Sequence, residues 1–193
     1  MSITGIMPAP RCLTPRGWVS PPPEDYRRLL AFRRESVPTA GEQEALFRLF
    51  ETPERVRAHC DAVRRTVLAL AAEVPGIDLC LLEAAVKLHD AARNRRNHPA
   101  VLAEELERIG YGRLATVIRM HMDLPESMSD TLDERSLLYL ADKLVREDRY
   151  VGLEERFRAS ELRFQDRPEA LAAARRRKAI AQKILEKIQK LHR

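Results

Sequence analysis

Five residues whose side chains commonly bind metal ions are spread over the middle of this chain: His59, His89, Asp90, His121 and Asp142. Each lies in, or at the edge of, an apolar run with helical character. Burial of an imidazole or a carboxylate is unfavourable unless the group is paired or binds a metal. One inward-facing histidine is usually a satisfied core residue, but five converging ligand types favour a metal centre.

The adjacent pair His89-Asp90 restricts where such a centre can be. Neighbouring residues on an α-helix point about 100° apart, so His89 and Asp90 can reach one ion only near a helix end or a kink. The asparagine-rich loop after Arg93 is consistent with a helix end. His59 would come from a preceding helix and Asp142 from a later one. Three helices would then converge on the metal, as they do in helical bundles with a metal in the core.

The helix that carries His59 has clear predicted limits. Thr52 is a suitable N-cap and Pro53 a suitable first helical residue, and the helix is expected to reach Val74, before Pro75-Gly76. His59 lies between apolar residues at helical spacing, so it is predicted to face inward.

Helical periodicity continues through the rest of the chain. Asp78 is a candidate N-cap for a helix that reaches His89-Asp90. Neither strand-like alternation of useful length nor an internal repeat is present, so the predicted fold class is all-α. The later helices are expected over residues 101–109, 113–121, 133–149, 154–164 and 168–191.

The N-terminal part differs in composition from the rest. Seven of the twelve prolines lie in the first 40 residues. Residues 1–20 are therefore expected to be irregular, followed by short helices at 25–34 and 41–51. The predicted organisation is an irregular N-terminal extension at 1–51, a central domain at 52–165 and a basic C-terminal helix packed on that domain at 166–193.

The positive charge is concentrated at the C-terminal end. The whole chain carries a net charge of +5, and residues 170–193 hold eight Lys and Arg against one acidic residue. A basic helix can contact nucleic acid, but a solvated helix face is the commoner explanation. The absence of interleaved aromatic residues argues further against a nucleic-acid partner.

The cysteines and the apolar runs indicate the compartment. Cys12, Cys60 and Cys80 are sparse, and no CxxC pair is present, so neither a disulfide framework nor a zinc knuckle is expected. Isolated cysteines fit a reducing cytoplasm. No apolar run approaches membrane-spanning length, and no signal peptide is recognisable at the start.

The order His59, His89-Asp90, Asp142 resembles the pattern of the HD superfamily of metal-dependent phosphohydrolases. His59 matches the first histidine of that pattern, His89-Asp90 the doublet that names the family, and Asp142 the closing aspartate. His89 follows His59 by 30 residues, and Asp142 follows Asp90 by 52. The resemblance covers about residues 59–142, continues less closely to Phe157, and implies an HD-domain-like helical bundle.

The resemblance also implies a chemistry. Its cofactor would be a divalent metal, one ion or two, of Mn, Fe, Mg, Co, Ni or Zn. The metal would lower the pKa of a bound water, so that hydroxide attacks a phosphoryl group near neutral pH. Asp90 would be both a ligand and the acceptor of the water's proton. The expected partner is a small phosphorylated substrate, such as a nucleotide, and an oligomer remains possible.

Cationic residues near the pattern are candidates for binding the substrate phosphate. Arg93 follows Asp90 by three residues and shares its helical face. Lys143 and Arg146 flank Asp142 in a similar way. A guanidinium group can bind two phosphate oxygens at once. The alternative for each of these residues is an ion pair with a carboxylate or exposure to solvent.

Two further histidines bear on the number of metal ions. In the family, extra histidines between the doublet and the closing aspartate mark two-metal centres. His121 resembles such a ligand, just past a helix end. His98-Pro99 resembles the family's His-Pro step, and His98 is left as either a site residue facing the substrate phosphate or a surface histidine.

The residues after the doublet depart from the better-known branches. Several HD hydrolases carry an acidic residue shortly after the aspartate, whereas Ala91, Ala92, Arg93 and Asn94 follow Asp90 here. The substrate is therefore left open. The departure also supports an alternative, in which the domain binds a nucleotide or a metal as a sensor with little or no turnover.

Overall fold

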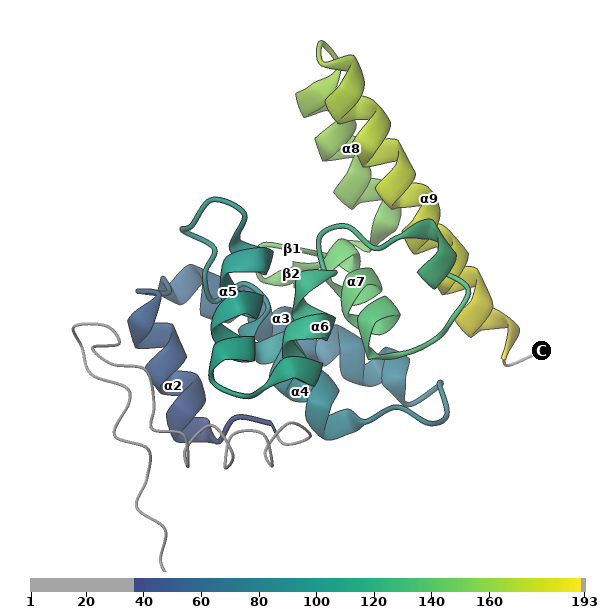
Figure 1. The fold of residues 1–193 in the computed structure, drawn as a ribbon. Helices are drawn as coiled ribbons and strands as arrows, with labels where there is room; N and C mark the ends of the chain where they lie inside the picture. The colour runs from purple at the N-terminus through teal and green to yellow at the C-terminus, as the bar shows by residue number, and fades with distance from the viewer. Residues whose placement is uncertain (1–36, 192–193) are drawn as a thin grey trace, which may run out of the picture.

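Almost every regular element between residues 37 and 191, the part of the chain that the computed structural model describes, is an α-helix (Figure 1). The prediction of an all-α fold is confirmed. The predicted irregular segment 1–20 and the predicted helix 25–34 lie outside the described residues. The helices are α2 (Ala40–Leu49), α3 (Glu54–Ala71), α4 (Leu79–Leu88), α5 (His98–Arg108), α6 (Gly112–Arg119), α7 (Glu134–Leu144), α8 (Gly152–Phe164) and α9 (Pro168–Lys190), with a 3₁₀ turn at Glu126–Met128.

The start of α3 differs from the prediction. Pro53 holds the N-cap position and makes no side-chain cap, and Thr52 does not cap the helix. Instead the Thr52 hydroxyl, which is buried, donates a hydrogen bond of 2.7 Å to the carbonyl oxygen of Ala91. The Thr52 hydroxyl thus donates to a distant carbonyl group and does not accept from the local amides of α3 as a cap would, and the bond ties the start of α3 to the turn after Asp90.

The following helix begins where the sequence indicated. The Asp78 side chain accepts a hydrogen bond of 3.0 Å from the Leu81 amide, which confirms Asp78 as the N-cap of α4. This helix ends at Leu88, His89 holds its C-cap position, and Asp90 lies in the turn that follows. The doublet therefore stands at a helix end, as its two adjacent ligand types require.

Helices α5 and α6 form an antiparallel pair beside α4 (Figure 1). Helix α5 begins at His98, three residues earlier than expected, because Pro99 suits the first turn of a helix. Asn97 precedes it with a φ of 55°. Helix α6 ends at Arg119, so His121 lies just beyond its C-terminus.

Helix α7 is shorter than the predicted helix at 133–149. The backbone leaves the helix at Val145, which is extended with φ −110° and ψ 141°. A short hairpin follows, in which the two-residue strand β1 (Val145–Arg146) pairs antiparallel with the two-residue strand β2 (Arg149–Tyr150). Glu147, at the turn, has a φ of 56°. The helix prediction at 145–149 was wrong, since the buried Val145 and this turn redirect the chain toward α3.

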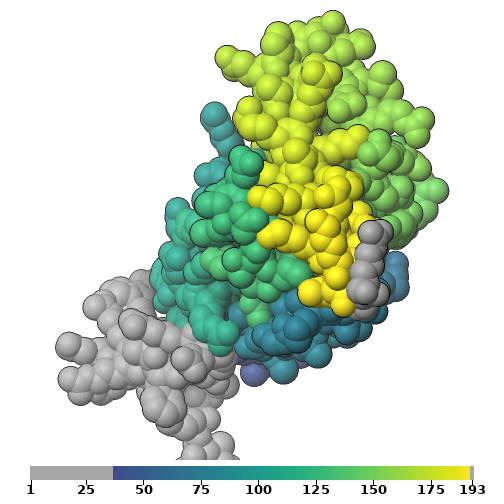
Figure 2. Space-filling view, turned by 90° about the vertical axis from the view of Figure 1, so that its right-hand side faces the viewer, coloured from purple at the N-terminus to yellow at the C-terminus, as the bar shows by residue number. Residues whose placement is uncertain are grey.

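The last two helices form a hairpin that projects beyond the other helices (Figure 1). The lower part of α9 packs against α7 through buried Ala181, Ile184 and Ile188. In the space-filling view α9 is a continuous band at the surface, with α8 beside it (Figure 2). Four of its basic residues pair with carboxylates elsewhere in the chain: Arg177 with Asp123, Lys178 with Glu154, and Lys183 and Lys187 with Asp130.

One hydrophobic core runs through the described helices. Leu46, Phe47 and Phe50, in and just after α2, belong to the same cluster as buried residues of α3 to α9. Helix α2 is therefore packed on the body of the molecule. Over residues 37–191, none of the helices combines the length and the apolar character that crossing a membrane requires.

Candidate metal centre

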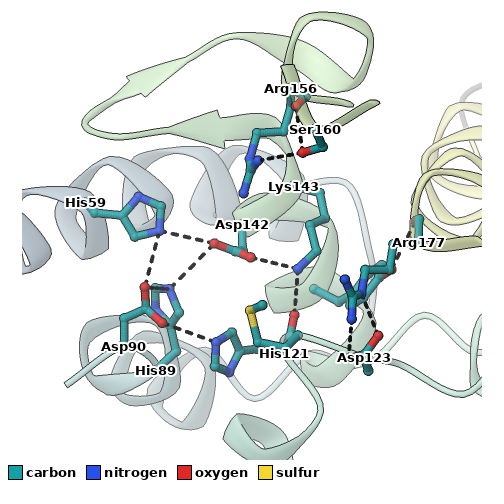
Figure 3. A network of polar contacts seen from close by, with 12 residues as sticks. His59, His89, Asp90, His121, Asp123, Asp142, Lys143, Arg156, Ser160 and Arg177 are labelled. Carbon is teal, nitrogen blue, oxygen red and sulfur yellow. Dashed lines mark hydrogen bonds and ion pairs between the residues drawn. The ribbon is translucent and has the colours of Figure 1, made fainter. Parts of the chain in front are cut away.

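His59 enters the site from α3. Its Nδ1 lies 2.6 Å from the carbonyl oxygen of Glu147 in the hairpin turn, and its Nε2 lies 3.1 Å from Asp142 Oδ1 and 3.9 Å from Asp90 Oδ2 (Figure 3). A carbonyl oxygen can only accept a hydrogen bond, so Nδ1 carries the proton. The Nε2 atom is thereby left to face the carboxylates.

His89 is fully buried and is oriented in the same way. Its Nδ1 donates to the Val86 carbonyl oxygen at 2.7 Å. Its Nε2 lies 3.9 Å from Asp90 Oδ2 and 3.8 Å from Asp142 Oδ1. Neither distance is a hydrogen bond, and within the described chain Nε2 is a buried nitrogen with no hydrogen-bond partner.

Asp142 closes this side of the site from the last turn of α7. Its Oδ1 faces both His59 and His89, and its Oδ2 accepts a hydrogen bond of 2.8 Å from Lys143 Nζ. The Asp142 side chain is almost completely buried. Two carboxylates and two histidines, from α3, the end of α4 and α7, therefore converge as the sequence predicted.

A second group lies on the other side of Asp90. Asp90 Oδ1 is 2.9 Å from His98 Nε2 and 3.3 Å from His121 Nε2, and the two histidine nitrogens are 3.3 Å apart. His121 is fully buried, and its Nδ1 donates to the Ile118 carbonyl oxygen at 2.8 Å. The start of α5 and the end of α6 thus supply one histidine each.

The two groups share one residue. Ligand atoms of His59, His89 and Asp90 lie within 4.8 Å of one another, and so do those of Asp90, His98 and His121. Each group can hold a divalent metal ion. His59, His89 and His121 all have Nδ1 fixed by a backbone carbonyl, the arrangement that usually orients Nε2 of a histidine toward a metal.

The buried Nε2 atom of His89, which has no hydrogen-bond partner in the described structure, indicates whether a metal fits the site. A buried polar atom without a partner is unfavourable by about 1–3 kcal/mol. In the neutral ring His89 Nε2 carries a lone pair, since Nδ1 donates to the Val86 carbonyl oxygen, and Nε2 points between two carboxylate oxygens. A cation among these atoms satisfies the nitrogen and both carboxylates at once, so the donor set fits a metal.

The electrostatics of the cluster also favour a cation. Burial raises the pKa of Asp90, but His89, His121 and His98 overcome that effect and hold the pKa well below its usual range. Asp142 is similar: burial is opposed by Lys143 and the neighbouring histidines, and its pKa is also held low. Both carboxyls are therefore anionic.

The pKa values of the two fully buried histidines, His89 and His121, are shifted in opposite directions. Burial lowers the pKa of His121, which keeps that ring neutral. Burial also acts against a charge on His89, but Cys60, Asp90 and Asp142 together raise the pKa of His89 well above its ordinary value. Positive charge is therefore favoured at the position between the carboxylates.

The predicted phosphate-binding residues have different surroundings. Lys143 is buried and donates to Asp142 Oδ2 and to the His121 carbonyl oxygen at 2.9 Å. It therefore supports two candidate ligands, and because it also lines the cavity beside them, its role as a phosphate contact stays a prediction. His98, predicted to face the phosphate, contacts Asp90 and His121, and its role toward a phosphate stays a prediction.

Arg93 and Arg146 keep an exposed side. Arg93 Nη1 lies 3.2 Å from Asp90 Oδ1, while its side chain remains about half exposed at 46%. Arg146 is at 4.0 Å from Glu155 and is similarly exposed. Both line a cavity of about 720 Å³ that opens beside His59, Asp90 and Asp142. Arg93 therefore pairs with a carboxylate and also reaches the cavity.

Sequence reasoning did not identify the far wall of this cavity. Arg156, Ser160 and Arg163 line it from α8, together with Arg55 from α3 and Arg177 from α9. The spacing of Arg156, Ser160 and Arg163 does indicate one helical face. Nothing in the local sequence indicates that this face lies opposite the ligands, since that depends on how α8 folds back over α7.

Comparison of the chain with protein-family models, with curated proteins and with solved structures gave no match in any of the three. The evidence for the all-α fold and for the candidate metal centre therefore comes from the chain's own residues and geometry.

Proposed function

We propose that this protein is a metal-dependent phosphohydrolase that acts on a nucleotide or another small phosphate ester, with two divalent ions that share Asp90. One observation carries the proposal. Asp90 presents Oδ1 to His98 and His121 and Oδ2 to His59 and His89, at the edge of a cavity rich in arginine. The order of these residues resembles the HD superfamily pattern, which favours the same chemistry.

The residues divide naturally between the two ions. His59, His89 and Asp142 would hold one ion, His98 and His121 the other, and Asp90 would bridge them. Four histidines among six ligands favour Mn, Fe, Co, Ni or Zn over Mg, because imidazole is a poor ligand for Mg. When bound, such ions supply positive charge for phosphoryl oxygens and make water acidic enough to attack near neutral pH.

The protein's own groups would orient the ligands and bind the ester. Glu147, Val86 and Ile118 fix the three buried or half-buried imidazoles through their carbonyl oxygens. Arg93 reaches the cavity beside Asp90 and would pair with a phosphate oxygen. Because the two oxygens of Asp90 face different pairs of histidines, we assign Asp90 the role of shared ligand ahead of proton acceptor.

A sensor that binds metal or nucleotide without turnover is the second candidate. This candidate is supported by the residues that follow His89-Asp90. Ala91 and Ala92 are fully buried, and Arg93 is the first side chain after Asp90 that reaches the cavity. In that part of the structure no acidic side chain follows Asp90 into the site. The two candidates share the metal centre and differ only in turnover.

Metal analysis and turnover assays separate these possibilities. Purified protein loaded with Mn or Fe should hydrolyse para-nitrophenyl phosphate, its bis-ester or a member of a nucleotide panel. Asp90→Ala should abolish turnover and metal retention, whereas Asp61→Ala, an exposed carboxylate on α3, should change neither. Full metal occupancy without turnover of any substrate would favour the sensor. A wild-type protein that retains no metal would overturn both candidates.

A further inference from the structure

The cavity beside the metal centre has an unusually one-sided charge. Apart from the candidate ligands, its ionisable lining consists of seven cationic side chains and one carboxylate, that of Glu147. Residues 1–169, which supply six of those seven cations, have a net charge near −2. The positive charge is thus gathered at the cavity and is not a general property of this part of the chain.

Two of these cations lie on one face of α8. Arg163 follows Arg156 by seven residues, two helical turns, and Ser160 lies between them on the same side. Seven residues of α-helix span about 10 Å. The cationic face of α8 is therefore longer than a single phosphate group, and it forms the wall opposite the candidate ligands.

Arg156 and Arg163 differ from most of the other cavity cations in having no acidic partner. Arg177 pairs with Asp123, and Lys143 pairs with Asp142. Within residues 37–191, neither Arg156 nor Arg163 has a carboxylate at ion-pair distance. The Arg163 guanidinium lies 5.6 Å from the centre of the Phe164 ring, and the Arg156 guanidinium hydrogen-bonds only to Ser160. Their charge is left available to a ligand.

Arg156 gives the more specific indication. Its Nε is buried and lacks a hydrogen-bond partner in the described structure, and its single hydrogen bond, from Nη1 to Ser160 Oγ, is long at 3.5 Å. Buried guanidinium nitrogens normally have an acceptor. In Figure 3 the Arg156 side chain extends from α8 toward the side of the centre formed by Asp142 and Lys143. An anion in the cavity would supply the acceptor that the protein does not.

We propose that this face of α8 is a second phosphate-binding subsite, so that the substrate carries at least two phosphate groups. One phosphate would be bound at the metal centre, which rests on the proposed function, and another would be bound by Arg156 and Arg163. The ligand class is a linear polyphosphate, either alone or attached to a nucleoside. Paired guanidinium groups suit the several oxygens of such a chain.

Binding without turnover tests the subsite. Orthophosphate and tripolyphosphate are titrated by calorimetry into the full-length protein after treatment with EDTA, at fixed ionic strength, because salt screens exposed charges. Tripolyphosphate should bind at least about tenfold more tightly than orthophosphate. Arg156→Gln and Arg163→Gln should each weaken tripolyphosphate binding about tenfold, since each removes a charged hydrogen-bond donor.

A matched variant controls for general loss of charge. Arg158 lies on α8 between the two arginines but is exposed and outside the cavity lining. Arg158→Gln should leave tripolyphosphate affinity within about twofold. Arg156→Lys, which keeps the charge and loses the planar fork, should fall between wild type and Arg156→Gln. Circular dichroism on each variant verifies the helical fold.

Two results would overturn the subsite: equal affinity for the two probes, or an Arg158→Gln loss as large as that of Arg156→Gln. Turnover of para-nitrophenyl phosphate by the metal-loaded protein is measured separately and tests the proposed function alone. Adenosine triphosphate as a third probe identifies the source of the chain. If adenosine triphosphate binds more tightly than tripolyphosphate, the ligand is a polyphosphate attached to a nucleoside. If the two bind equally, the subsite recognises the phosphates alone.

Discussion

Asp90 Oδ1 lies 2.9 Å from His98 Nε2. This contact joins the turn after α4 to the first residue of α5, and it gives the Asp90 carboxylate a second set of histidine neighbours. The other oxygen faces His59 and His89. A carboxylate placed in this way can serve two metal ions, because each oxygen can bind a different one.

His98→Ala should therefore change the metal stoichiometry. With His98 removed, His121 and one oxygen of Asp90 are too few ligands for a stable second site, so metal content should fall from about two ions per chain to about one. Inductively coupled plasma mass spectrometry on the purified proteins measures this. Arg95→Ala, in the same loop and exposed, is the control. If the metal content of His98→Ala equals that of the wild type, His98 is not a metal ligand.

Chelation should lower the stability of the protein. Asp90 and Asp142 are buried anions only partly balanced by Lys143 and the neighbouring histidines, so a bound cation stabilises the folded state selectively. EDTA should lower the Tm by several degrees, and titration with Mn²⁺ should restore it with saturation near two equivalents. Differential scanning calorimetry gives both values. A Tm that is insensitive to EDTA and Mn²⁺ would argue against any resident metal.

Lys143→Met should destabilise the metal-free protein more than the metal-loaded one. Loss of the ammonium leaves the buried Asp142 carboxylate without a compensating charge, which is unfavourable by about 3–5 kcal/mol. A bound metal would offset part of that loss. Urea unfolding with and without EDTA measures the difference between the two states.

A surface ion pair provides the comparison for Lys143. Lys178 donates to Glu154 at 2.8 Å, where the carboxylate is largely exposed. Lys178→Met should therefore change the free energy of unfolding by less than about 1 kcal/mol in both states. Equal losses for Lys143→Met with and without metal would mean that Asp142 does not contact the ion.

Thr52→Val should weaken the turn that carries the doublet. The substitution removes the hydrogen bond to the Ala91 carbonyl oxygen and leaves that buried acceptor unsatisfied, with an expected loss of about 1–3 kcal/mol. Thr52→Ser, which keeps the hydroxyl, should retain most of the stability that Thr52→Val loses. Thr66→Val, which removes a bond to Ala62 within α3, should have a smaller effect. If metal affinity is unchanged in Thr52→Val, the bond stabilises the fold without positioning Asp90.

Local sequence patterns determined much of the fold. Apolar residues at helical spacing predicted the helices between residues 40 and 190, and Asp78 was identified as an N-cap because the amide that donates to it is only three residues away. The same periodicity put His59 on an inward face, and the adjacency of His89 and Asp90 required a helix end. Side-chain direction along one helix is a local property, so these features could be read from the chain.

The tertiary structure decided what each residue contacts. Thr52 left its expected cap for Ala91, and Lys143 turned inward to Asp142 and His121. The α8 wall of the cavity became part of the site only because the hairpin after Val145 reverses the chain and places α8 in contact with α7.

For the same reason His98 could not be assigned from sequence. Its Nε2 has Asp90 and His121 as neighbours only once α5 and α6 pack beside the end of α4. The sequence by itself supplied the ligand types and their order. Their division into two groups around Asp90 depended on distances between helices, which the packing of the core sets and which no local pattern encodes.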